Sequence, residues 1–292
     1  MNARISKALL RLWLILISCK AIAEEPHVLV LYPAAAPPIS SIYATTIKGI
    51  KTRVKRIDAV AIPETARLAD VKPSIDRIHP DIIIALGNQA AEFIKPSPYR
   101  SQSLLGLVYF DHAESHGVSL RLDSQILTSN LQRLTPRIRQ VFIVENSSHL
   151  ILQQDSSATT SKPLLTIRTG NDMKTTMRIL GELLEHDATP EDSILIPADI
   201  PKDILYEASN IAWRKNIALL STNLSHLEYG VLMTFNPNLL ALGEQLGDMA
   251  NQQTVTYEPM KKVDVALNQR VAQHMDMHFD PSALSAFSLV LE

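Results

Sequence analysis

An apolar run followed by a glycine turn and a helical pattern, at residues 80–95, constrains the fold more than any other feature. Residues 82–86 read Ile-Ile-Ile-Ala-Leu, without the polar alternation of a half-exposed strand. Such runs are typical of strands covered on both faces, which occur mainly in parallel sheets flanked by helices. Gly87 permits a sharp turn, and Asn88 and Gln89 open the helix. The segment predicts an interior strand whose carboxyl end, with free backbone N–H groups, faces a ligand.

Apolar strand-like runs alternate with helical patterns along the rest of the chain. The expected strands are 27–32, 58–62, 82–86, 104–110, 140–145, 164–168, 193–197, 217–221 and 231–235. The expected helices are 39–53, 64–78, 88–95, 124–134, 147–155, 171–185, 203–215 and 238–252. This alternation predicts an α/β fold of parallel sheets with helices on both faces. A length of 292 residues favours two such units.

The N-terminal segment 1–23 is typical of a secretory signal. It carries basic residues, then a short apolar stretch, and ends in Ala21-Ile22-Ala23, a small-x-small cleavage site. The apolar stretch is too short to span a membrane. Leu16-Ile17-Ser18-Cys19 also resembles the lipobox at which bacterial lipoproteins are acylated. Two routes stay open: cleavage after Ala23, or lipid attachment to Cys19, the only membrane contact we expect. Both predict a periplasmic or otherwise exported protein.

Charge and cysteine content narrow the class of protein further. Removing the signal takes away four of the 28 basic residues and no acidic one, so 24 face 30 acidic residues, a formal charge of −6. This mildly acidic balance, without basic clusters, argues against nucleic acid as a partner. Cys19 is the only cysteine, so no intramolecular disulfide can form.

Catalytic and metal-binding motifs have little support in the sequence. We find no Gly-x-Ser-x-Gly elbow, His-Glu-x-x-His helix, phosphate-binding glycine loop or Rossmann fingerprint, so we expect no enzyme and no cofactor. His112 and His116, and likewise His274 and His278, are spaced four residues apart around a carboxylate, which is compatible with zinc. Solvated polar turns explain both groups more simply, and we predict no metal site.

The order of several segments resembles that of a known family. These segments are 80–87 with Ala90-Ala91, 117–119, 131–144, 194–199, 217–221, 230–232, 242–246, and 263–268 with Val271-Ala272. In this order they are similar to substrate-binding proteins of ABC transporters with the type I periplasmic binding fold, a group that includes presumed tryptophan and tyrosine importers. Each segment is a weak hydrophobic pattern, and the resemblance rests on their order.

The resemblance implies a two-lobed periplasmic-binding-protein type I fold, each lobe a mostly parallel sheet with helices on both faces. The chain would cross between lobes three times, with 24–120 plus 231–255 in the first lobe and 121–230 plus 256–292 in the second. A small molecule, an amino acid or a similar metabolite, would bind in the cleft between the lobes for delivery to an ABC permease.

The strand ends that would face this cleft supply the candidate ligand-binding residues: Asn88, Gln89, Tyr109, Asp111, Asn146, Asp199, Asn223 and Phe235. The amides at the start of the 88–95 helix suit a carboxylate. Either aspartate is suited to an ammonium group, and either aromatic ring could cover an apolar portion by stacking. Each residue is equally well explained as a polar cap or loop residue.

The sequence also departs from the family pattern. The segment 111–117 is short and has His112 where proline is expected, and Gly87-Asn88 replaces the more usual hydroxyl residue at the start of the helix. A second hypothesis therefore stands beside transport: an envelope regulatory or assembly protein that uses the same fold to bind a protein partner.

Overall fold

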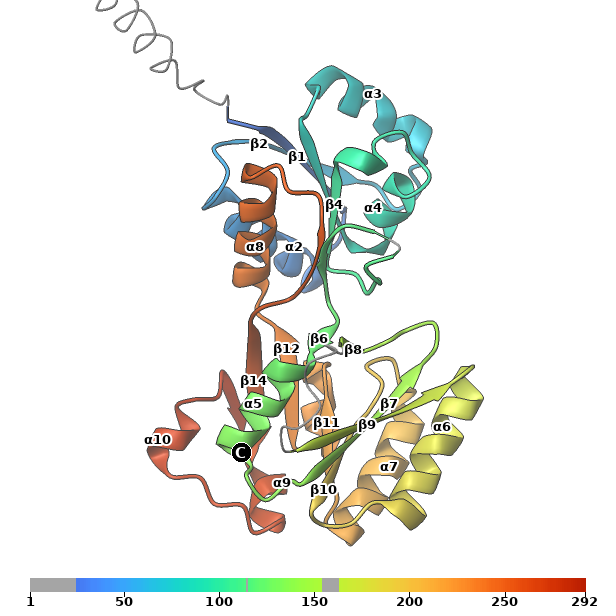
Figure 1. Ribbon diagram of the computed structural model, residues 1–292, viewed down its shortest axis with the longest axis vertical. Helices are drawn as coiled ribbons and strands as arrows, with labels where there is room; N and C mark the ends of the chain where they lie inside the picture. The colour runs from blue at the N-terminus through green and yellow to red at the C-terminus, as the bar shows by residue number, and fades with distance from the viewer. Residues whose placement is uncertain (1–24, 114, 154–162) are drawn as a thin grey trace, which may run out of the picture.

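The computed structural model describes residues 25–113, 115–153 and 163–292. They form two α/β lobes, one above the other in Figure 1. The predicted signal and lipobox at 1–23 lie outside the described residues. Within the described part, no helix is both long enough and apolar enough to cross a membrane.

The first lobe is built on a six-stranded sheet in the order β13-β5-β4-β3-β1-β2, with all pairs parallel. Its strands are β1 (His27–Pro33), β2 (Arg56–Ile62), β3 (Ile82–Leu86), β4 (Ser103–Gly106), β5 (Gly117–Ser119) and β13 (Tyr257–Pro259). Helices α2 (Ile39–Lys51) and α8 (Leu239–Asn251) cover one face, and α3 (Leu68–Ile78) and α4 (Gly87–Ile94) the other. A 3-10 turn, η1 (Arg100–Gln102), precedes β4.

The second lobe holds a seven-stranded sheet in the order β15-β14-β12-β11-β10-β7-β9, in which β12 and β14 are antiparallel. Its strands are β7 (Gln140–Asn146), β9 (Leu164–Gly170), β10 (Asp192–Leu195), β11 (Ala218–Ser221), β12 (Met233–Pro237), β14 (Val263–Asn268) and β15 (Leu289–Leu291). The helical elements are α5 (Ser124–Leu134), α6 (Met173–Glu182), η2 (Leu183–Asp187), α7 (Lys202–Lys215), η3 (Leu224–Tyr229), α9 (Gln269–His274) and α10 (Pro281–Leu284). A small pair, β6 (Leu122–Asp123) and β8 (Leu152–Gln153), lies beside this sheet.

Strand β3 shows why its sequence is apolar throughout. Ile82 and Ile84 pack into the cluster beneath α2 and α8, whereas Ile83 and Ala85 pack into the cluster beneath α3 and α4. All four side chains are buried because both faces of the sheet are covered. The predicted interior strand and the predicted α/β fold, with mostly parallel sheets in two lobes, are confirmed.

The crossings between lobes differ in part from the prediction. Residues 231–255 were expected in the first lobe, but β12 (Met233–Pro237) is hydrogen-bonded between β11 and β14 of the second sheet. Conversely, β13 (Tyr257–Pro259) was expected in the second lobe and pairs with β5 of the first. The chain therefore crosses near residues 120–121, at Asn238 and at 260–262. Hydrophobicity alone does not say which sheet a buried strand joins.

Two predicted elements are wrong in the described part. The expected helix 147–155 is absent from 147–153, because the Glu145 carboxylate accepts hydrogen bonds from the N–H groups of Ile151 and Leu152, and the chain then pairs with β6. The expected strand 104–110 ends at Gly106, because Leu107 has a left-handed φ of 58°, which a strand cannot contain.

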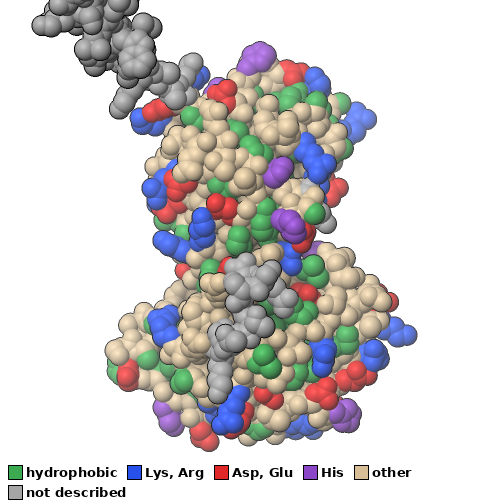
Figure 2. All heavy atoms as spheres, in the orientation of Figure 1, with side chains coloured by type: hydrophobic (Ala, Val, Ile, Leu, Met, Phe, Trp, Pro, Cys, Tyr) green, Lys and Arg blue, Asp and Glu red, His purple; other side chains and the backbone are tan. Residues whose placement is uncertain are grey.

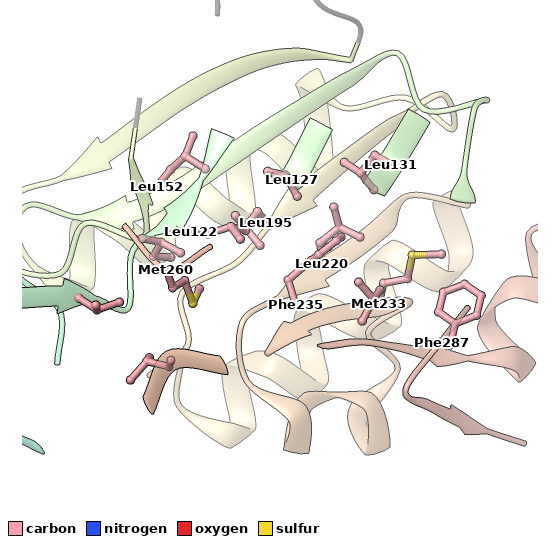
Figure 3. Packing of buried hydrophobic residues seen from close by; sticks show 14 of the residues in the cluster. Leu122, Leu127, Leu131, Leu152, Leu195, Leu220, Met233, Phe235, Met260 and Phe287 are labelled. Carbon is pink, nitrogen blue, oxygen red and sulfur yellow. The ribbon is translucent and has the colours of Figure 1, made fainter. Parts of the chain in front are cut away.

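An apolar cluster continues from one lobe into the other through the crossings. Leu122, Leu152 and Met260 join the residues beneath α2 and α8 to those beneath α5. Figure 3 shows these three side chains beside Leu195, with the core of the second lobe extending to Phe235. The lobes are thus connected by packed side chains as well as by the chain itself.

Candidate functional site

The carboxyl ends of the parallel strands in the two sheets face each other at the junction of the lobes. From the first lobe, the Tyr109 hydroxyl reaches to 3.5 Å from the Thr222 hydroxyl of the second lobe. Burial raises the pKa of Tyr109, and the charge of Asp199 acts in the same direction, which places that carboxylate nearby. Of the predicted site residues, Tyr109 therefore reaches the second lobe, and the charge of Asp199 is near enough to act on its hydroxyl.

A small cavity of about 70 Å³ lies at this junction. Tyr109, Phe110, Asp111 and Arg121 line it from the first lobe and the first crossing, and Ser147, Ser148 and Leu150 line it from the second lobe. In Figure 2 the surface narrows to a waist where the lobes meet. We call this cavity the interlobe cavity. Residues from both lobes form its walls, as a site that responds to lobe closure requires.

Arg121 is the central charged group beneath the interlobe cavity. Its side chain is only 9% exposed, and it lies in the first crossing. One terminal nitrogen donates to the Asp111 carboxylate at 2.7 Å, and the other donates to the carbonyl oxygen of Leu152, also at 2.7 Å. The guanidinium thus connects a strand-end loop of the first lobe to β8. Its Nε has no partner among the described residues.

Asp111 is held in its ionised form by several donors. The backbone N–H of Ala113 lowers the pKa of its carboxyl, and the Arg121 guanidinium lowers it further. His112 Nδ1 also lies 2.7 Å from this carboxylate. Glu145, the second carboxyl group near Arg121, is buried at the end of β7, and this burial raises its pKa. The sequence predicted Asp111 as a partner for a ligand ammonium group. In the structure its carboxylate already pairs with Arg121 and contacts His112.

The predicted ligand wall at the start of α4 is less open than expected. Gln89 is partly buried, and its amide donates to the carbonyl oxygens of Pro63 and Glu64, at 2.8 and 3.3 Å. Asn88 is exposed. A Cβ atom added at Gly87 would lie 2.8 Å from the Tyr43 hydroxyl, so the Tyr43 side chain from α2 lies against the turn. Gly87 has φ +81°, as the predicted sharp turn requires.

The predicted asparagines of the second lobe serve first as local caps. The Asn146 Oδ1 accepts from the N–H and hydroxyl of Ser148, and the Asn223 Oδ1 accepts from the N–H and hydroxyl of Ser225. The Asn223 amide also donates to the carbonyl oxygen of Ala198, which fixes the loop that carries Asp199. These asparagines shape the strand ends on which the junction is built.

Phe235 is not at the junction. Its side chain is fully buried in β12 and packs with Leu220 and Met233 in the core of the second lobe, as Figure 3 shows. The prediction that Phe235 covers a ligand is therefore wrong. The residue was expected at a strand end of the first lobe, and it lies in the core of the second. An aromatic residue in a strand does not reveal from sequence alone whether it faces a core or a cleft.

Sequence reasoning missed Arg121, Thr222 and Tyr43. One signal for Arg121 was available: it is the only charged residue in the otherwise apolar or small run Gly117–Leu122, where a charge would be buried and would need a partner. Thr222 and Tyr43 carry no comparable signal, because each acts through contacts with distant segments.

A larger groove of about 310 Å³ lies elsewhere, between α8 and the segment 258–262. Its charged groups are largely matched to one another: Lys261 pairs with Glu258 at 2.8 Å, and Arg53 lies 3.6 and 3.7 Å from Glu244 and Asp248. None of the residues that line this groove belongs to a strand end of the second sheet. We therefore place the candidate site at the interlobe cavity despite its smaller volume.

No group of histidine, cysteine and acidic residues suited to a metal ion is found in the described ranges. His112 instead contacts Asp111, and His274 stacks on Trp213 with ring centroids 3.6 Å apart. Both histidine pairs noted in the sequence thus have at least one member engaged in an ordinary contact.

Comparison with known proteins identifies the fold but no close relative. No family model matches the chain, and no curated protein matches it. Among solved structures, an ABC domain from Streptococcus pneumonia in complex with L-Trp covers 92% of this chain and 100% of its own, at 12% identity and a TM-score of 0.54. A ligand-free, open substrate-binding protein with adhesive properties from Clostridium difficile covers 91% of this chain and 99% of its own, at 14% identity and a TM-score of 0.56.

A conserved domain protein from Vibrio cholerae also aligns over 91% of this chain and 100% of its own, at 12% identity and a TM-score of 0.53. At such low identities the similarity is one of fold. The resemblance seen in the order of segments is confirmed at that level: the chain has the two-lobed type I periplasmic binding fold.

Proposed function

We propose that the chain is an exported solute-binding protein that captures a small molecule in the interlobe cavity. The observation that carries this proposal is the composition of the cavity wall, which combines Tyr109 and Asp111 from the first lobe with Ser147 and Ser148 from the second. A ligand that contacts both sets of residues would bind the closed arrangement of the lobes more tightly than an open one, and would thereby stabilise closure.

The fold neighbours support this use of the junction. One of them is described in complex with L-Trp and another as a ligand-free, open substrate-binding protein. By analogy of fold alone, we infer that this chain passes its ligand to an ABC permease at the outer face of a membrane. The signal-like segment 1–23 supports export, and Cys19 offers a lipid anchor if the lipobox is used.

We infer binding rather than catalysis. The junction does contain a serine and a histidine in contact, since Ser221 Oγ lies 2.9 Å from His226 Nδ1. Both side chains are buried, however, so a substrate cannot reach this hydroxyl. Burial also lowers the pKa of His226 to about 4, because it disfavours the charged imidazolium. The pair is better explained as packing beneath the strand ends.

Thermal unfolding of the mature chain in the presence of a broad metabolite panel tests the proposal. A ligand present at a hundredfold excess over its Kd should raise the free energy of unfolding by about 2.7 kcal/mol. Tyr109→Phe and Ser148→Ala should reduce this stabilisation. Tyr206→Ala is the matched control, because that tyrosine is 62% exposed on α7 and does not line the interlobe cavity. No stabilisation by amino acids, peptides, sugars and nucleosides would contradict the proposal.

One observation favours the second hypothesis, a regulatory or assembly protein that binds another protein. The interlobe cavity measures about 70 Å³, whereas pockets for small molecules usually measure about 300–1,000 Å³. Under this hypothesis no small molecule stabilises the chain, and Tyr109→Phe changes nothing but the contact with Thr222. The thermal panel therefore separates the two hypotheses.

A further inference from the structure

The charge of the interlobe cavity carries an inference about the chemical class of its ligand. We propose that the ligand presents a neutral hydroxyl- or amide-bearing group to this cavity and not a carboxylate. The inference rests on the proposed binding function, and it goes beyond it by excluding the free carboxylate that an amino acid would bring.

The first argument is that the charges lining the cavity compensate each other. The lining residues include one cation, Arg121, and one carboxylate, Asp111, and these two are joined at 2.7 Å. The other terminal nitrogen of Arg121 donates to the carbonyl oxygen of Leu152. A ligand carboxylate would therefore approach a guanidinium whose charge is already matched, and it would lie next to the carboxylate of Asp111. Like charges this close are unfavourable, although water reaches the Asp111 side chain, which is 34% exposed, and weakens the repulsion.

The second argument is that the other expected carboxylate receptor is partly occupied by groups of its own lobe, with Asn88 left exposed. The start of α4 was predicted to offer backbone N–H groups and the amides of Asn88 and Gln89. In the structure the Tyr43 side chain lies against Gly87, and the Gln89 amide donates to Pro63 and Glu64.

The third argument is the chemistry that the cavity does offer. Tyr109, Ser147 and Ser148 line it with hydroxyl groups, which both donate and accept hydrogen bonds. Two of these hydroxyls have long protein partners, at 3.5 Å for Tyr109 and at 3.4 Å from Ser147 to the carbonyl oxygen of Asn171. Long hydrogen bonds of this kind are readily exchanged for bonds to a ligand. Phe110 and Leu150 add apolar wall, so a neutral group with a polar edge fits the lining.

Isothermal titration of the mature chain with matched neutral and anionic compounds tests the inference. The pairs are D-glucose with D-gluconate and indole-3-acetamide with indole-3-acetate, and L-tryptophan is added because a fold neighbour is described with it. We expect a neutral member to bind at least about tenfold more tightly than its carboxylate partner. We also expect its Kd to stay within about twofold between low and high salt, since no net charge is neutralised.

The variant Asp111→Asn tests most directly whether the charge of Asp111 excludes a carboxylate ligand. It removes the charge that compensates Arg121, so D-gluconate or indole-3-acetate should bind this variant at least about tenfold more tightly than the wild type, whereas the neutral partner should change less. His112→Gln is the control: it removes the other side-chain neighbour of Asp111 and leaves the pair with Arg121 intact. Its preference should match that of the wild type. Circular dichroism of each variant establishes that it is folded.

Four results would overturn the inference. A carboxylate that binds the wild type more tightly than its neutral partner, or L-tryptophan binding at the interlobe cavity, leaves the proposed function standing and refutes the neutral-ligand assignment. An Asp111→Asn variant that folds and gains no affinity for carboxylates refutes the charge argument itself. If none of these compounds binds, and no metabolite of the thermal unfolding panel stabilises the chain, the proposed binding function is refuted as well.

Discussion

Two places at the carboxyl edge of the first sheet differ in a way that the sequence does not reveal. The turn from β3 into α4 has the features of a ligand receptor: a buried strand, Gly87 with positive φ, and polar residues at the helix start. The second place is the wall of the interlobe cavity beside the first crossing, around Arg121, which we call the floor; its signals in the sequence are weaker, a single charge in an apolar run and the strand-end residues Tyr109 and Asp111. In the structure Tyr43 lies against Gly87 of the turn while Asn88 stays exposed, and the interlobe cavity lies at the floor.

The difference lies in which distant residues reach each place. Tyr43 comes from α2, and Gln89 is drawn toward the end of β2, so the turn is partly occupied by its own lobe. The floor instead receives Ser147 and Ser148 from the second lobe, because Glu145 and β8 hold that loop against the first crossing. A strand-turn-helix motif shows where a ligand could bind, and the side chains that arrive from elsewhere decide whether the place is free.

The largest expected effect on the free energy of unfolding comes from removing Arg121, the buried cation of the floor. Arg121→Met removes a buried guanidinium and leaves Asp111 and the carbonyl oxygen of Leu152 without their donors. Removing one partner of a buried pair costs about 3–5 kcal/mol of the free energy of unfolding, and we expect the lower end, about 3 kcal/mol, because the Asp111 side chain is 34% exposed. Arg139→Met is the matched control, because Arg139 pairs with Glu191 on the surface at 3.1 Å and such pairs contribute about 0–1 kcal/mol. Equal losses in urea unfolding would show that Arg121 is not a central buried contact.

The next effect concerns pH and the matching edge of the second lobe, where His226 is buried and this burial lowers its pKa. Its pKa falls from 6.5 to about 4 on folding, so the native state binds fewer protons than the unfolded state between these values. The free energy of unfolding should therefore decrease as the pH falls from 6.5 to 4, by about 2–3 kcal/mol from this group.

The variant His226→Gln isolates this contribution from the carboxyl groups that titrate in the same range. Its stability should depend less steeply on pH between 6.5 and 4 than that of the wild type. His278→Gln serves as the control, since His278 is exposed, and should keep the wild-type slope. An unchanged slope in His226→Gln would mean that the imidazole is hydrated in the native state.

A smaller effect tests whether Tyr43 lies against the turn as described. Gly87→Ala places a Cβ at positive φ, which costs about 1–2 kcal/mol, and 2.8 Å from the Tyr43 hydroxyl. In a Tyr43→Phe background the steric part should shrink to the contact with the ring carbon Cε1 at 3.3 Å, so the loss in thermal stability should be smaller. The same loss in both backgrounds would mean that Tyr43 does not lie against the turn and that the comparison with the floor fails.

The smallest effect separates the two neighbouring amides of the turn. Gln89→Ala should cost about 1 kcal/mol, because two carbonyl oxygens lose their donor. Asn88→Ala should change the free energy of unfolding by less than about 0.5 kcal/mol, as expected of an exposed side chain away from special features. If Asn88→Ala instead abolishes ligand stabilisation in the thermal panel, the turn rather than the floor holds the ligand.

Local patterns in the sequence predicted most of the fold. Strand β3 and helix α5 begin and end where expected, since an unbroken apolar run and an Asp123 cap define their limits. Non-local contacts explain the failures. The chain after Asn146 does not form a helix because Glu145 binds its N–H groups, and β12 joins the second sheet because of its pairing with β14.

The site was less predictable than the fold for the same reason. Tyr109 and Asp199 were predicted because each follows a strand of a parallel sheet, and the structure places the Tyr109 hydroxyl near the second lobe; their role in binding stays a prediction. Phe235 was misplaced because apolar patterning does not separate a core residue from a ligand-facing one. Asp111 was identified, but its partner Arg121 lies ten residues further on, and only the folded chain shows that they meet.

A crystal structure of the mature chain with the compound that stabilises it most tests the central claim directly. We predict density for that compound between the lobes, in contact with Tyr109 of the first and with Ser147 or Ser148 of the second. Density confined to the turn at Gly87, or to the groove between α8 and residues 258–262, would contradict the assignment of the site to the interlobe cavity.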